Sequence, residues 1–139
     1  MSLEKVQQAL LTRYKTIFPS PTYATAWENV AITPPTGAPW FSFRFVPVTS
    51  KIVSLGPNGY DEENGYVQVD INVPALAGEA SLRSLFTQLR TCFPSASSLI
   101  YGGQSVSILS VSRSGGSEVD GFYRIACTVR WKAQVPRQA

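Results

Sequence analysis

The chain has 139 residues, 44% of them hydrophobic and 15% charged, and its formal net charge is +3. This length fits one domain, 1–139, with a core of its own, and the composition excludes a disordered or fibrous protein. No run of about 18 apolar residues is present, so no membrane-spanning helix is expected. The absence of histidine removes the commonest general base and metal ligand.

An amphipathic helix is predicted at the start of the chain. Its apolar residues recur at spacings of three and four: Leu3, Val6, Leu10, Tyr14 and Ile17. Ser2 fits an N-cap, and Pro19 ends the pattern. The segment 19–39 that follows is rich in proline and has no clear period, so we interpret it as an ordered connector or arm.

Two strands are predicted next, because apolar and polar residues alternate over 41–46 and again over 66–73. The polar, glycine-containing stretch between them, 50–64, is predicted to be a long loop. Pro74 ends the second strand. Apolar residues spaced by three and four then predict a second helix over 78–93.

The rest of the sequence is typical of a hairpin, with strands at 106–111 and 122–131 joined by a glycine-bearing loop. The element order is therefore helix, strand, strand, helix, strand, strand (α-β-β-α-β-β). This order predicts an α+β fold in which a four-stranded, largely antiparallel sheet has two helices packed on one face.

No motif in the sequence indicates a catalytic residue, a cofactor or a metal site. The acidic run Asp61, Glu62 and Glu63 lacks the ligand alternation of an EF-hand loop and is interpreted as part of a solvated loop. Cys92 and Cys127 form no C-x-x-C and are expected to be buried, reduced thiols. Proteins that bind nucleic acids usually carry a cluster of basic residues, and a net charge of +3 does not indicate such a cluster.

One face of the predicted sheet is polar. It carries Arg44, Gln68, Asp70, Arg124, Thr128, Arg130 and Lys132. The pattern alone favours plain solvent exposure, since antiparallel sheets commonly have one wet face. The alternative is a subunit contact or the wall of an aqueous channel. There, Asp70 would hold one of the arginines, and the excess positive charge would suit DNA or an acidic partner.

The element order and several short segments resemble the tail terminator proteins of long-tailed, siphovirus-type bacteriophages over nearly the whole chain. The segments are the helix from Leu3, the connector Trp27-Glu28-Asn29, the strand Phe43-Arg44-Phe45, residues 65–74 followed by Gly78 and a helix, and the strand Phe122-Tyr123-Arg124-Ile125. The resemblance implies a non-enzymatic virion protein. Such a protein forms a ring, usually a homohexamer, which caps the tail tube, stops its polymerisation and joins the tail to the head connector.

The implied partners are copies of the chain itself, the tail tube protein and the head-to-tail connector protein. DNA would pass through the ring without specific recognition, and neither a cofactor nor a membrane would be involved. The protein would be made in the host cytoplasm and reside in the virion tail. For such a ring we predict a subunit interface or channel wall at Arg44, Asp70, Arg124, Arg130 and Lys132. We also predict a docking loop that includes Lys51, Tyr60, Asp61, Glu62 and Glu63.

Three other interpretations stay open. Another neck or tail-tube subunit would share these features, and a tube subunit would form open tubes instead of closed rings. A small nucleic-acid-binding module would bind DNA or RNA with a strong dependence on salt. A small enzyme would need a deep pocket with convergent carboxylates.

Overall fold

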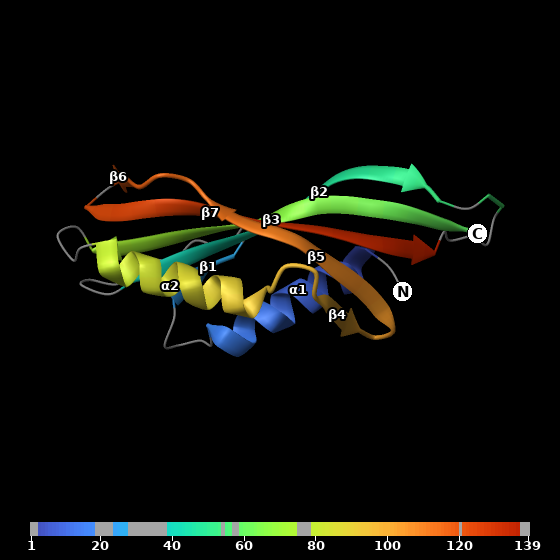
Figure 1. Cartoon of the computed structure of the whole chain (residues 1–139), viewed down its shortest axis with the longest axis horizontal. Helices are drawn as coiled ribbons and strands as arrows, with labels where there is room; N and C mark the ends of the chain where they lie inside the picture. Colours follow the sequence, from blue (N-terminus) through green and yellow to red (C-terminus); the bar gives the residue numbers. More distant parts are fainter. Residues whose placement is uncertain are drawn as a thin grey trace.

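The computed structural model describes residues 3–18, 24–27, 39–53, 55–56, 59–74, 79–119 and 121–136. This part of the chain forms two helices and seven strands, whose arrangement can be followed in Figure 1. In chain order they are α1 (Leu3–Ile17), β1 (Ala24–Ala26), β2 (Trp40–Ile52), β3 (Tyr60–Pro74), α2 (Glu79–Cys92), β4 (Ser98–Tyr101), β5 (Gln104–Arg113), β6 (Ser117–Val119) and β7 (Phe122–Pro136). Both helices were predicted from their periodicity and are confirmed within a residue or two.

The seven strands form one mixed sheet in the order β1-β2-β3-β7-β5-β4, and β6 pairs with the start of β7. β1 pairs with β2 in parallel, and every other pairing is antiparallel. The prediction of a four-stranded sheet was therefore wrong, although the fold is α+β with two helices. The additional strands β1, β4 and β6 have only three or four residues each, too few to show an alternation in the sequence.

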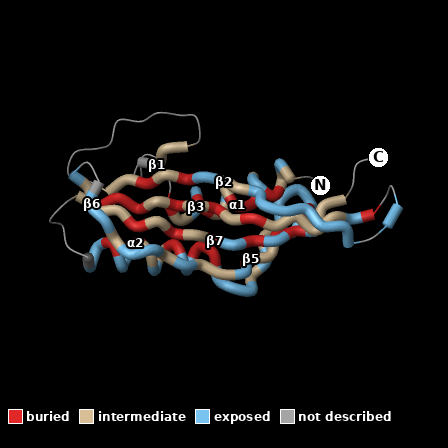
Figure 2. Tube along the Cα trace, turned by 90° about the horizontal axis from the view of Figure 1, so that it is seen from above, coloured by how far each residue is buried: buried red, intermediate tan, exposed pale blue. Residues whose placement is uncertain are grey.

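The helices pack on one face of the sheet, and the core lies between them and the central strands (Figure 1). Buried positions run through the middle of the sheet, whereas most positions at one end are exposed or only partly buried (Figure 2). Tyr14 of α1 anchors this packing, because its ring contacts Phe18, Trp27 and Phe43 at centroid distances of 5.2, 5.8 and 4.9 Å. Its hydroxyl also shares a hydrogen bond of 3.0 Å with Thr25 of β1.

The predicted loop over 50–64 was also wrong for most of its length. β2 continues to Ile52, and β3 already begins at Tyr60, so the two strands form a long hairpin. A register shift between Pro47 and Thr49 marks a β-bulge in this hairpin, and β3 stays paired with β7 beyond it, as far as Tyr60 opposite Pro136. All six residues of β2 over 47–52 are exposed. A strand segment that is exposed on both faces does not alternate between apolar and polar residues, so the sequence gives no strand signal there.

Other predictions fall partly outside the described residues. Within the predicted connector 19–39, the described residues are 24–27 and 39, and the first three of them form β1. Ser2, Pro19, Glu28, Asn29 and Gly78 all lie outside the described residues. No helix in the described ranges is both long enough and apolar enough to cross a membrane.

Candidate functional site

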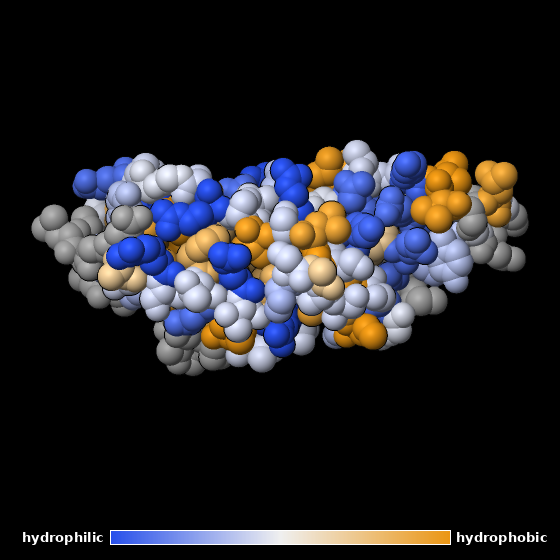
Figure 3. Space-filling model, in the orientation of Figure 1, coloured by the Kyte–Doolittle hydropathy of each residue, from blue (hydrophilic) through white to orange (hydrophobic). Residues whose placement is uncertain are grey.

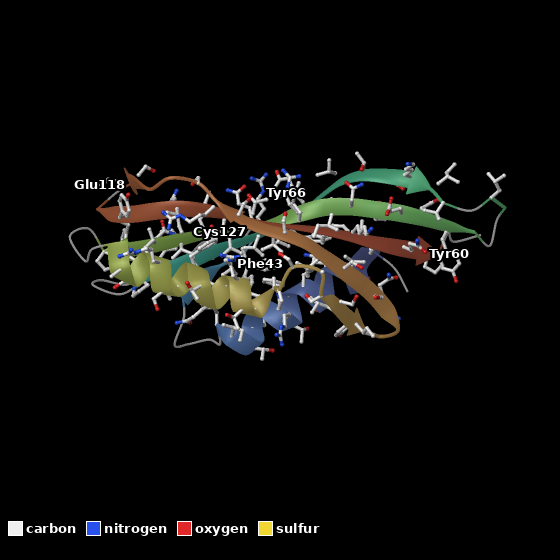
Figure 4. The ribbon with its side chains drawn as sticks, viewed as in Figure 1. Phe43, Tyr60, Tyr66, Glu118 and Cys127 are labelled. Carbon is white, nitrogen blue, oxygen red and sulfur yellow. The ribbon has the colours of Figure 1, made fainter. Side chains whose placement is uncertain are left out.

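Five residues predicted to form an interface or channel wall lie on the same face of the sheet, the one away from the helices. The strand register pairs Arg44 with Gln68 and Gln68 with Thr128. The same register places the other four residues on the same face as Arg44: Asp70, Arg124, Arg130 and Lys132. We call this surface the polar sheet face. Figure 4 shows Tyr66 on this side of the sheet, whereas Phe43 and Cys127 lie on the side of the helices.

Asp70 does not play the part that the sequence indicated. Its carboxylate accepts one hydrogen bond from Ser42 Oγ at 3.1 Å and another from Gln68 Nε2 at 3.1 Å. The donors are neutral side chains of β2 and β3 instead of an arginine. Arg44, Arg130 and Lys132 are exposed, so they give the polar sheet face its positive charge.

Arg124 differs from the other basic residues of this face because it belongs to a partly buried network. Its Nε donates a hydrogen bond of 2.6 Å to Oδ1 of Asn72, and its guanidinium lies 5.8 Å from the ring centroid of Trp40. Asn72 is completely buried and donates from Nδ2 to the carbonyl oxygen of Trp40 at 3.3 Å. The alternation over 66–73 puts Asn72 on the polar side of its strand, but an alternation in the sequence does not show that tertiary contacts bury this residue.

The second surface is the exposed end of the sheet, which we call the hairpin arm and define as the described residues of 47–64. The arm extends beyond both helices (Figure 1), and apolar surface gathers at its end (Figure 3). Large apolar side chains are exposed there: Val48, Ile52, Val53, Leu55 and Tyr60, with Leu55 exposed to 88% and Ile52 to 61%. Sequence reasoning treated this segment as polar. The signal that it missed was the set of apolar residues within 48–55.

The residues predicted for a docking loop all lie on the strands of the hairpin arm. Lys51 pairs in register with Glu62, and Ser50 Oγ donates a hydrogen bond of 2.9 Å to Glu63 Oε1. Because side chains alternate along a strand, Asp61 and Glu63 share one face of the arm and Glu62 the other. Across the described residues, no group of three acidic or cysteine side chains could hold a metal ion. Tyr60 lies near the far end of the arm (Figure 4).

A groove beside α2, which we call the α2 groove, is a third surface feature. It has a volume of about 430 Å³. Its lining comes from α2, from the residues that follow α2 and from β5: Thr87, Arg90, Thr91, Phe93, Pro94, Ser95 and Val111. A smaller hollow of about 190 Å³ is lined by Arg44, Gln68 and Asp70 of the polar sheet face and also by Trp27 and Phe43.

Both cysteines are free thiols buried in the core. Burial raises the pKa of the Cys92 thiol to about 12, with the charge of Arg13 acting in the opposite direction. Burial likewise raises the pKa of the Cys127 thiol to about 12, and Arg113 opposes that shift. Both thiols are therefore protonated at neutral pH, and neither is an activated nucleophile.

The comparisons with known proteins agree on the fold. One solved structure, which carries no functional name, has a TM-score of 0.78 at 20% identity and covers 97% of both chains. A chain from the virion of a native gene transfer agent particle has a TM-score of 0.56 at 12% identity, covering 96% of this chain and 97% of that chain. No curated protein matched the sequence.

The family comparison gives the class of protein, a structural component of a phage tail. The matching family model is described as "Phage tail terminator protein", and it covers residues 5–131. The chain belongs to this family, which confirms the resemblance seen in its sequence.

Proposed function

We propose that this protein assembles into a closed ring, a homohexamer, which caps the tail tube, stops its polymerisation and joins the tail to the head connector. The observation that supports assembly is the hairpin arm. Soluble proteins that act alone rarely expose several large apolar side chains next to one another, and such patches usually mark a contact with another protein. Membership of the phage tail terminator family supports a role for this contact in the virion tail.

The polar sheet face is proposed to line the channel of the ring or to meet a neighbouring subunit. Arg44, Arg130 and Lys132 are exposed there, and the carboxylate of Asp70 is already satisfied by two neutral donors. Exposed cations attract phosphates without reading base sequence, so this face suits DNA that passes through the ring without being specifically recognised. The proposed role requires no catalytic residue, cofactor or metal ion.

The experiment is to measure the mass of the purified protein, alone and mixed with assembled tail tubes, and to examine both samples by electron microscopy. We expect closed rings, on their own or only at the ends of tubes, and tubes that no longer grow when more tube protein is added. Open tubes built from this chain would contradict the proposal and indicate a tube subunit. A salt-dependent shift with short DNA, without any assembly, would indicate a nucleic-acid-binding module instead.

A further inference from the structure

We infer that the hairpin arm of one copy docks into the α2 groove of the next copy. The occupant of the groove is thus a second copy of this chain. The inference rests on the proposed function in one respect only, namely that copies of the chain assemble. It adds the two surfaces that meet and the head-to-tail direction of the contact.

The arm offers apolar side chains that its own chain does not bury. Leu55 and Ile52 are 88% and 61% exposed, and Val53 and Tyr60 are also exposed. Apolar surface gathers at the end of the arm, the part farthest from the helices (Figure 3). Clustered apolar groups on a projecting element are suited to insertion into a neighbour, because burying apolar surface is favourable and these groups are buried only when a partner covers them.

The arm is also held in shape before it binds. Its two strands pair from Thr49 opposite Asn64 to Ile52 opposite Asp61, and β3 pairs on its other side with β7 as far as Pro136. At its base the ring of Phe45 stacks on Trp131 at 5.3 Å with an interplanar angle of 8°. A segment that is already ordered loses little conformational freedom on docking, which favours binding.

The α2 groove has the matching chemistry. Pro94 and Val111 supply apolar surface, Phe93 beside them is fully buried, and Arg90 supplies a cation. The hydroxyl groups of the two threonines in the lining are already used within the helix. Thr87 Oγ1 donates to the carbonyl of Arg83, and Thr91 Oγ1 donates to that of Thr87, each at 3.0 Å. These hydroxyl groups therefore do not need hydrogen-bond partners from an incoming chain.

Charge complementarity identifies a second copy as the occupant. The arm carries Asp61, Glu62 and Glu63 against one cation, Lys51. Among the described residues, the lining of the α2 groove carries one cation, Arg90, and no acidic residue. An acidic, apolar arm and a basic, partly apolar groove on the same chain are complementary surfaces.

The arrangement in space makes the contact intermolecular. The arm lies at one end of the molecule, and the last turn of α2 lies near its middle (Figure 1). Two different surfaces that meet between identical chains form a head-to-tail contact, which generates a ring when the rotation closes. The hollow at Asp70 is a poorer receptor for the acidic arm, because it is smaller and the one cation among its described lining residues, Arg44, is accompanied by the carboxylate of Asp70.

Disulfide trapping tests the geometry. Leu55 and Ser95 are exposed, so a Leu55→Cys/Ser95→Cys chain can form disulfides only between copies if the arm docks as inferred. After mild oxidation we expect a ladder of linked species on a non-reducing gel, and each single variant should give none. The control Leu55→Cys/Ser112→Cys places the second thiol on the polar sheet face. A ladder from this control, or equal linking by Leu55→Cys alone, would overturn the inference.

Charge reversal gives an independent measurement that needs no new cysteine. Arg90→Glu should lower the assembled fraction by about tenfold or more, and adding Glu62→Lys should restore part of it. Arg83→Glu, the same change outside the groove, is the matched control and should have a smaller effect. Equal assembly of wild type and Arg90→Glu, together with no ladder, would refute the docking but leave the proposed function intact. Wild-type chains that never associate, even on tail tubes, would refute both.

Discussion

Arg124 on β7 donates a hydrogen bond of 2.6 Å from Nε to Oδ1 of Asn72 on β3. Asn72 is completely buried, and its amide nitrogen bonds the carbonyl of Trp40 on β2 at 3.3 Å. Trp40 in turn makes an edge contact with Phe122 at 5.9 Å. One polar side chain therefore joins three adjacent strands at the end of the sheet opposite the hairpin arm.

Replacing Asn72 by Ala is expected to lower the free energy of unfolding by about 1–3 kcal/mol, because Arg124 loses its acceptor and a buried carbonyl loses its donor. In a double-mutant cycle, Asn72→Ala and Arg124→Ala should be non-additive by about 0.5–3 kcal/mol. Urea unfolding of the four proteins measures both values. Gln68→Ala is the control on the same strand and face, and an equal loss there would show that the network contributes nothing special.

Gly65→Ala is expected to lower stability by about 1–3 kcal/mol through overpacking. A Cβ atom at this position would lie 2.8 Å from Cα of Pro47 and 3.0 Å from Cζ2 of Trp131, and it would also meet the carbonyl oxygen of Val46. Thermal unfolding measures the effect. Gly115→Ala is the matched control, because a Cβ atom there would meet nothing within 4 Å. Similar melting temperatures for the two variants would contradict the prediction.

Cys92 and Cys127 should be reduced and dispensable for assembly. In the native protein at pH 8 we expect neither thiol to react with a thiol reagent, whereas both should react in urea. Cys92 donates from Sγ to the carbonyl of Arg13 at 3.2 Å, so Cys92→Ala should cost about 1–2 kcal/mol through this contact and lost packing. A double Cys→Ala variant that folds but fails to assemble would show a role for the thiols.

The same burial makes the protein sensitive to alkali. Each thiol has its pKa raised by burial from 9.0 in the free group to about 12 in the folded protein. Between these values the unfolded chain releases protons that the folded chain keeps. The free energy of unfolding is therefore unaffected by ionisation of the thiols below about pH 9. Between about pH 9 and pH 12 it falls as the pH rises, by about 1.4 kcal/mol per pH unit for each thiol. Urea unfolding at pH 8 to 11 measures the slope, and the double Cys→Ala variant should show a shallower one.

Arg44→Glu and Arg130→Glu test the polar sheet face. Both side chains are exposed, and exposed charges contribute only about 0–1 kcal/mol to folding, so both variants should unfold like the wild type. The effect should be seen in ring formation or in particle yield, which are measured in parallel. If both variants fold and give infectious particles at the normal level, this face is only a solvated surface.

The sequence was sufficient for elements whose burial is periodic. Leu82, Leu85 and Leu89 fix one face of α2, and the strict alternation from Val67 to Val73 fixes the inner face of β3. The same alternation correctly gave the side of Arg44 and Arg130, because parity along a strand determines the face of the sheet.

Sequence reasoning failed where burial is not periodic or where a partner comes from a distant strand. The end of β2 is exposed on both faces, so its residues gave no strand signal and the whole arm was interpreted as a loop. The hydrogen bonds of Asp70 depend on Ser42 and Gln68 being placed beside it, and alternation does not supply that information. The burial of Asn72 likewise depends on the tertiary contacts of Trp40 and Arg124.

The position of β7 has a consequence for the kinetics of folding. β7 follows all the other described strands in the chain, yet it lies in the centre of the sheet between β3 and β5. Pro74 pairs with Phe122, so even the paired residues of β3 and β7 that are nearest in sequence are separated by α2, β4, β5 and β6. Pairing between such distant segments must overcome a large entropy of loop closure, which slows folding. During synthesis the exposed edges of β3 and β5 therefore wait for β7, and in this interval the nascent chain is open to mispairing or to chaperone binding.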